Sequence, residues 1–138
     1  MGVDASWPLK AAIQDVLRRS NHMRSAMGES GRFPETDCAG TQHEALPAVA
    51  FSRMTSRVWH SATFDGQDHE IVLQIDAKDR KTLRDISRAV TEILHNADFP
   101  VSGHALIEMS FESSQTSDDV AGEQNRCLMF FRALTVSD

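Results

Sequence analysis

The side chains in this sequence that could carry chemistry are its histidines, its cysteines and one group of carboxylates. The chain has six histidines, at positions 22, 43, 60, 69, 95 and 104. Metal binding and acid–base catalysis need such residues on one face of an element, commonly as HxxxH or beside a carboxylate. The six histidines lack that spacing, and His60 and His69 fall in opposite arms of a predicted hairpin. We therefore expect them to be solvated or held by structural hydrogen bonds.

The pair Cys38 and His43 could place a thiol nucleophile beside a base. A working pair of this kind also needs an orienting group and an oxyanion site, and the flanking residues supply neither. The second cysteine, Cys127, is far from Cys38 in sequence and forms no CxxC motif with it. Two reduced thiols are the simpler interpretation.

Three carboxylates, Asp65, Asp68 and Glu70, surround the predicted hairpin turn. Turn chemistry and solvation account for them, with a weak cation site as the alternative. The sequence contains no GxxxxGK[ST], GxSxG or GxGxxG motif for nucleotide binding or serine hydrolysis. We expect no catalytic residue, no cofactor and no metal, and hence not an enzyme.

Size and charge narrow the class of protein further. A chain of 138 residues is the usual length of one domain. Its net charge of −6 disfavours a sequence-independent grip on nucleic acid or on an anionic membrane. No apolar run has the length of a membrane span, and the N-terminus lacks the apolar stretch of a signal peptide. A soluble cytoplasmic protein is the default expectation.

Two segments have the apolar period of amphipathic helices. A helix is predicted from Trp7 to Ser25, with Ser6 before it as the cap and Pro8 in its first turn. The clearest helix covers residues 79–97, with Asp79 at its N-cap. Between these helices, the polar segment 28–46 is predicted to be a long loop.

The remaining segments have the alternation of strands. We predict a short strand at 48–54, a hairpin over 57–76 that turns at Asp65-Gly66, and a strand at 105–112. A final strand at 127–136 is apolar on both faces, and a flexible hairpin tip at 114–125 precedes it. The order α-β-β-β-α-β-β predicts a single α+β domain, an antiparallel sheet of about four to five strands packed by two helices.

Aromatic residues beside arginines mark the candidate interface. Trp59 shares a strand face with Arg57, and it is either a core residue or an interface anchor. Phe130 shares a face with Arg132, and we favour an interface there because Phe131 already faces the core. The candidate subunit-interface residues are Arg57, Trp59, Val72, Gln74, Leu128, Phe130 and Arg132.

Five segments follow one another along most of the chain: PLKAAIQDVL, LPAVAF, VWHSATFDGQDHEIVLQI, DISRAVTEIL and FFRALT. In their order and spacing they resemble the tail-completion, or tail-terminator, family of long-tailed bacteriophages and gene transfer agents. The positions that match the family are Trp59, Gly66, His69 and the run 131–135. The segment 28–46 is more polar than is usual, and Asp76-Ala77 replaces an aromatic-polar pair.

The resemblance implies a structural role in the virion tail after assembly in the bacterial cytoplasm. Identical subunits would form a ring, of six copies by family likeness, at the head-proximal end of the tail tube. This ring would stop tube polymerisation and join the tail to the head connector, an adaptor or stopper protein. DNA would pass through the bore without specific binding, and no membrane is involved. The candidate docking residues for tube and connector are Arg32, Phe33, Glu35, Asp118, Asp119 and Val120.

Two other readings stay open at the level of sequence. One is a small cytoplasmic α/β enzyme or toxin that uses Cys38 and His43. The other is an adaptor that binds a peptide along a sheet edge.

Overall fold

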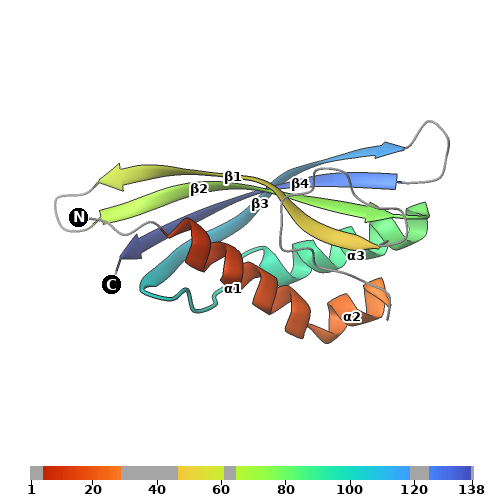
Figure 1. The fold of residues 1–138 in the computed structure, drawn as a ribbon, viewed down its shortest axis with the longest axis horizontal. Coiled ribbons are helices and arrows are strands. Elements are labelled where there is room, and N and C mark those ends of the chain that lie inside the picture. The colour runs from red at the N-terminus through yellow and green to blue at the C-terminus, as the bar shows by residue number, and fades with distance from the viewer. Residues whose placement is uncertain (1–4, 29–46, 61–64, 119–124, 138) are drawn as a thin grey trace.

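The computed structural model describes residues 5–28, 47–60, 65–118 and 125–137 of the chain. The elements are α1 (Ser6–Arg19), α2 (Asn21–Met27), β1 (Ala48–His60), β2 (Asp65–Ala77), α3 (Arg80–Leu94), β3 (His104–Asp118) and β4 (Asn125–Ser137). The four strands form one antiparallel sheet in the order β1-β2-β4-β3. All three helices lie on the same face of this sheet (Figure 1). The α+β class and the antiparallel sheet are therefore confirmed.

The core lies between the sheet and the helices. Alternate residues of the two central strands enter it, such as Ile71 and Leu73 of β2 and Phe131 of β4, each at most 1 % exposed. They pack with the apolar stripes of α1 and α3, which bury Leu9, Ile13, Leu17, Leu83, Ile86, Ala89, Val90 and Leu94. Each helix contributes one face because its apolar residues recur every three or four positions. The opposite face of the sheet carries none of the described helices.

The first predicted helix is two helices in the structure. α1 ends at Arg19, and Ser20, in an extended conformation, accepts a hydrogen bond from the Met23 N–H at 3.3 Å. Ser20 is thus the N-cap of α2. The predicted cap at Ser6 is wrong, since Ala5 precedes the helix without a side-chain cap. The Asp79 cap of α3 is confirmed by a 2.7 Å hydrogen bond from the Thr82 N–H.

Three strand predictions need correction. The segments 48–54 and 57–60 belong to one strand, β1, whose register shifts between Phe51 and Arg53. Asp65-Gly66 is not the turn: Gly66 pairs with Trp59 and Asp65 with His60, so both residues belong to the strand β2. The predicted tip 114–125 is also too long, because residues 114–118 belong to β3.

Candidate subunit interface

The outer sheet face, the face turned away from the helices, carries all seven candidate interface residues. Pairing places Arg57 opposite Asp68, Trp59 opposite Gly66, and Val72 opposite both Arg53 and Phe130. Since side chains alternate along a strand, these residues point away from Ile71, Leu73, Met129 and Phe131, which are in the core. Gln74 pairs with Leu128, and Glu70 with Arg132, on the same face.

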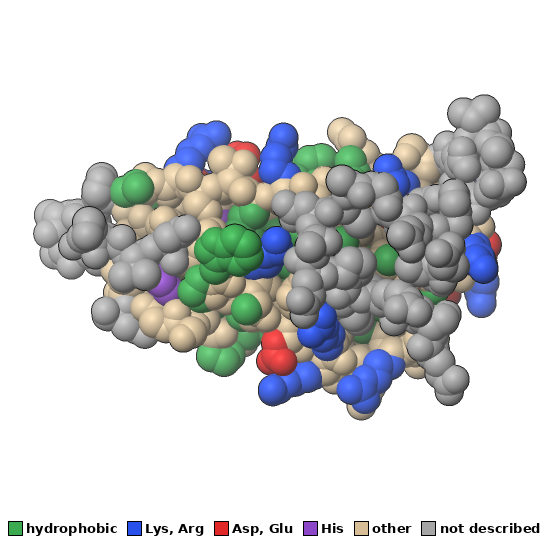
Figure 2. Space-filling model, in the orientation of Figure 1, with side chains coloured by type: hydrophobic (Ala, Val, Ile, Leu, Met, Phe, Trp, Pro, Cys, Tyr) green, Lys and Arg blue, Asp and Glu red, His purple; other side chains and the backbone are tan. Residues whose placement is uncertain are grey.

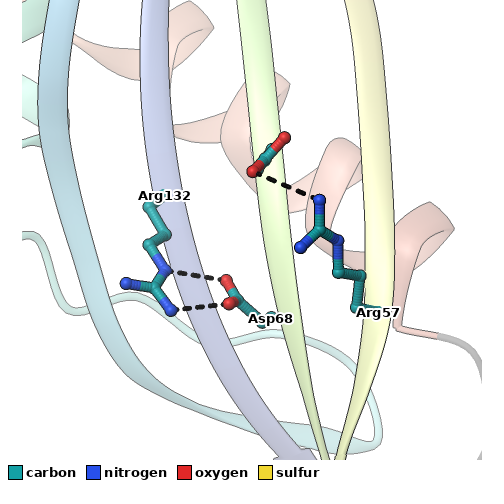
Figure 3. Close-up of polar contacts among 4 residues, drawn as sticks. Arg57, Asp68 and Arg132 are labelled. Carbon is teal, nitrogen blue, oxygen red and sulfur yellow. Dashed lines mark hydrogen bonds and ion pairs between the residues drawn. The ribbon is translucent and has the colours of Figure 1, made fainter.

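Two ion pairs cross the strands of this face. The Arg132 guanidinium donates from Nε and Nη2 to the two carboxylate oxygens of Asp68, at 2.9 and 2.6 Å. Arg57 lies 3.8 Å from a carboxylate oxygen of Glu70 (Figure 3). The hydrogen bond from Arg132 lowers the pKa of Asp68 below its ordinary value of 3.8, and the same contact raises the pKa of Arg132. The two-pronged contact fixes the direction of the Arg132 side chain.

A third ion pair lies at the other end of the outer sheet face. Arg126 donates from Nε to Asp76 at 2.8 Å, and Gln74 donates from Nε2 to the other oxygen of the same carboxylate at 2.9 Å. The Asp76 side chain is 1 % exposed, whereas that of Arg126 is 43 % exposed. A carboxylate this deeply buried needs such partners, because an unpaired buried charge is very costly.

The exposed apolar side chains of this face lie in two places: Leu128 and Phe130 between the Asp68–Arg132 and Asp76–Arg126 pairs, and Trp59 beyond Asp68, opposite Gly66. Leu128 and Phe130 are partly exposed, and Trp59 is 38 % exposed. Val72 and Gln74 are already buried in the single chain, at 5 % and 6 % exposure. The apolar surface that a partner could touch therefore consists of Leu128 and Phe130 on one side of Arg57 and Arg132, and of Trp59 on the other. Val72 and Gln74 add little to it, because they are already buried.

Gly66 is needed for packing against Trp59, a role that its place in a predicted turn did not indicate. A Cβ atom at this position would stand 2.7 Å from Cε3 of Trp59 and 3.0 Å from the carbonyl oxygen of Thr135. The missing side chain lets the indole lie over the neighbouring strand. Trp59 and Gly66, two of the positions that match the family, thus pack against each other across strands β1 and β2.

Three hydrogen-bonded polar side chains on the core side of the sheet, Ser56, His69 and Thr135, were not predicted from the sequence. We call this group the His69 relay. His69, fully buried, lies 2.7 Å from the Ser56 hydroxyl through Nδ1 and 2.9 Å from the Thr135 hydroxyl through Nε2. The relay joins β1, β2 and β4, which explains a histidine at the centre of the sheet without catalysis. Ser56 pairs directly with His69, whereas Thr135 lies one same-face position away from the residue opposite His69, Ala133; polar residues at these same-face positions are the signal that could have indicated it.

The other candidate sites are not brought together by the described structure. Cys38, His43, Arg32, Phe33, Glu35, Asp119 and Val120 lie outside the described residues, as does the side chain of Asp118. Within the described residues, no three His, Cys, Asp or Glu side chains are grouped so that they could hold a metal ion. No described helix is long and apolar enough to cross a membrane.

The fold and the outer sheet face define a two-layer α+β protein in which none of the described helices covers one face of the sheet. The model of the family described as tail completion protein gp17 matches residues 11–136, so the chain belongs to this family. Among solved structures, the chain is similar in fold to one in the virion of a native gene transfer agent particle. The TM-score is 0.82 at 19 % identity, over 99 % of this chain and 100 % of that one. No curated protein matches the chain.

Family membership confirms the resemblance that the sequence indicated. The chain is a structural tail protein of the phage type, and its place is the virion.

Proposed function

We propose that this chain is a tail terminator. Copies of it form a ring, of six subunits, on the head-proximal end of the tail tube, stop tube growth and present a surface to the head connector protein. In this proposal the chain performs no catalysis, and DNA passes through the bore without specific binding. The polar segments that hold Arg32, Phe33, Glu35, Asp118, Asp119 and Val120 dock against tube, connector or neighbouring subunits.

The observation that supports a ring is the outer sheet face. Partly exposed Leu128 and Phe130 lie on one side of the Asp68–Arg132 and Arg57–Glu70 pairs, and Trp59, 38 % exposed, lies on the other side. Tryptophan and arginine are enriched in interface hot spots, and covering such a face would remove apolar surface from water. A closed ring of identical subunits needs two different, complementary patches on each subunit. Trp59 and the neighbouring Phe130 and Leu128 are two separate apolar patches on this face, because the Asp68–Arg132 and Arg57–Glu70 pairs lie between them.

Purified chain and tail tubes test this proposal directly. Native mass spectrometry over a range of protein concentrations measures whether a defined oligomer forms. Electron microscopy of tubes that lack their terminator measures whether the chain binds at one end and stops further growth. Because the ring can require the tube as a template, end-binding is the decisive measurement. A chain that stays monomeric and ignores tube ends would exclude the proposal.

A further inference from the structure

A groove at one end of the subunit has the charge and shape to receive a peptide. It lies between α3 and the β3–β4 pair, has a volume of about 450 Å³, and is lined by Arg80, Leu83 and Arg84 of α3, Ser114 and Thr116 of β3, and Cys127 of β4. Leu83 and the Cys127 thiol, which are 3 % and 2 % exposed, form the apolar floor of the groove. The groove thus combines a small apolar surface with two guanidinium groups.

The positive charge of Arg84 is not neutralised by any described residue. Both arginines are exposed, and Arg84 has no ion pair with any described residue. Asp79, which is adjacent to Arg80 in sequence, already accepts the Thr82 N–H at 2.7 Å. Guanidinium groups bind carboxylates in a two-pronged geometry, so the groove is suited to acidic side chains.

The groove belongs to a basic side of an acidic protein. The three helices carry eight Lys and Arg residues and three Asp and Glu residues, a net charge of +5. The whole chain has a net charge of −6. Figure 2 shows basic side chains at the lower edge of the molecule, over the helices, and others along its upper edge. The acidic groups that balance them lie elsewhere in the chain, so a contact between the helix side of one copy and an acidic part of another is electrostatically favourable.

One segment of the chain has the complementary chemistry. Residues 118–123, with the sequence DDVAGE, contain three carboxylates, no cation and two small apolar residues. The segment starts where β3 ends, since Asp118 pairs with Asn125 of β4. Asn125 also donates a 3.3 Å hydrogen bond to the carbonyl oxygen of Lys78, just before α3. The acidic segment and the groove are therefore attached at the same end of the subunit.

We propose that the α3 groove receives the acidic 118–123 segment of a neighbouring copy of this chain. Carboxylates of the segment would bind Arg80 and Arg84, and Val120 would cover Leu83 and Cys127. The contact joins two different patches, the groove and the acidic segment, as a closed ring requires. It rests on the proposed ring and adds a complementary pair of patches to the outer sheet face. Nucleic acid is a poorer occupant, because the net charge of −6 repels a polyanion and the groove floor is apolar.

A peptide-binding measurement tests the groove separately from the ring. The receptor is the full-length chain with Asp118→Asn, Asp119→Asn and Glu123→Gln, which removes its own acidic segment as a competitor. The probe is a fluorescein-labelled peptide of residues 115–125, QTSDDVAGEQN, and its anisotropy reports binding. Arg84→Glu in the receptor should weaken binding at least about tenfold, since a charged contact is replaced by repulsion. Arg88→Glu is the matched control, one turn further along α3 and outside the groove, and should change affinity by less than about twofold.

Three outcomes of this measurement would overturn the inference. The acidic peptide fails to bind, a peptide with Asn, Asn and Gln in place of the three acids binds equally well, or Arg88→Glu weakens binding as much as Arg84→Glu. Circular dichroism of each receptor checks that it is folded.

A charge exchange then tests the contact in the assembled state. Arg84→Asp and Asp119→Arg should each reduce the oligomer or tube-end binding at least about tenfold, and the double variant should recover most of the loss. A wild-type ring that neither single variant disturbs would refute this contact and leave the proposed function intact. A wild-type chain without ring or tube binding would instead refute the proposed function, whatever the peptide does.

Discussion

At the scale of single residues, Gly66 determines how the outer sheet face is built. The indole of Trp59 occupies the space where any larger residue at position 66 would place its Cβ, at 2.7 Å from Cε3. Gly66→Ala should therefore displace the indole and cost about 1–3 kcal/mol of stability, the usual range for overpacking. Chemical denaturation measures the stability, and Trp59 fluorescence in a Trp7→Phe background reports the new ring environment.

A double variant separates this clash from a general intolerance at position 66. In a Trp59→Leu background, Gly66→Ala should cost clearly less, because the ring that it strikes is gone. Equal costs in both backgrounds would instead point to the second close neighbour, the Thr135 carbonyl oxygen at 3.0 Å.

The Asp68–Arg132 pair makes a prediction about pH. The hydrogen bond from Arg132 lowers the pKa of Asp68 in the folded chain, so the pair stabilises the fold above the unfolded pKa, near 3.8. That contribution is lost as the pH falls through the lowered folded value. In Arg132→Met, NMR titration should show the Asp68 carboxyl titrating at higher pH than in the wild type. The stability difference between the two proteins should be small, because the pair is exposed to solvent, and should shrink in acid. An unchanged Asp68 titration in the variant would contradict this account.

At the scale of elements, the His69 relay holds three strands in register. Thr135→Val removes the hydroxyl 2.9 Å from His69 Nε2 and leaves a buried ring nitrogen without that partner. The expected loss is about 1–3 kcal/mol, the cost of an unsatisfied buried polar group. Thermal or urea unfolding checks it.

Thr55→Val is the matched control for the relay. Thr55 is also in the sheet, on β1, but its side chain is exposed on the outer face. Valine suits a strand, so this control should leave stability within about 0.5 kcal/mol of the wild type. A similar loss in both variants would mean that the cost comes from the strand backbone and not from the relay.

The sequence predicts an element correctly where a local pattern of residues determines its position and ends. α3 was predictable because its apolar period and the Asp79 cap agree. The break at Ser20 was not, since Met23 and Met27 continue a buried apolar series beyond it. The Asp65-Gly66 turn was misplaced because Gly66 makes room for an indole from another strand, a tertiary demand that no local pattern contains.

The same limit applies to the candidate interface. Strand alternation was enough to put all seven candidates on one face, since it requires only the period of two. It could not tell exposed Arg132 from buried Val72 and Gln74, because burial depends on what surrounds the strand in space. Buried Asp76 accepts hydrogen bonds from Gln74 of its own strand, β2, and from Arg126 of β4, which is distant in sequence.

The edge strand β3 bears on the adaptor reading. The Asn96 N–H donates to the Met109 carbonyl at 2.8 Å, and the Phe111 N–H donates to His95 Nδ1 at 3.0 Å. These bonds occupy backbone groups that an added peptide strand would need. Register shifts after Leu106 and Phe111 further disturb this edge. Peptide capture along the middle of β3 is therefore disfavoured.

At the scale of the whole molecule, the two layers present different surfaces. The helical layer is net basic, whereas the outer sheet face combines exposed apolar side chains with paired charges. Such a subunit has distinct patches for distinct neighbours, which suits assembly into a closed ring more than independent function. The outer face should then be needed for assembly and dispensable for folding.

Phe130→Asp tests that division of roles. Phe130 is partly exposed on the outer face, next to the buried Phe131 of the core, so the variant should fold as a monomer. A charge in the middle of an apolar contact should prevent ring closure or weaken tube-end binding by at least about tenfold, because the carboxylate would be buried unpaired. Val58→Asp is the control: Val58 is 63 % exposed and points from β1 to the other side of the sheet. Native mass spectrometry and tube-end binding should separate the two variants. If Phe130→Asp unfolds the chain, Phe130 belongs to the core; if both variants assemble normally, the contact surface lies off the outer sheet face.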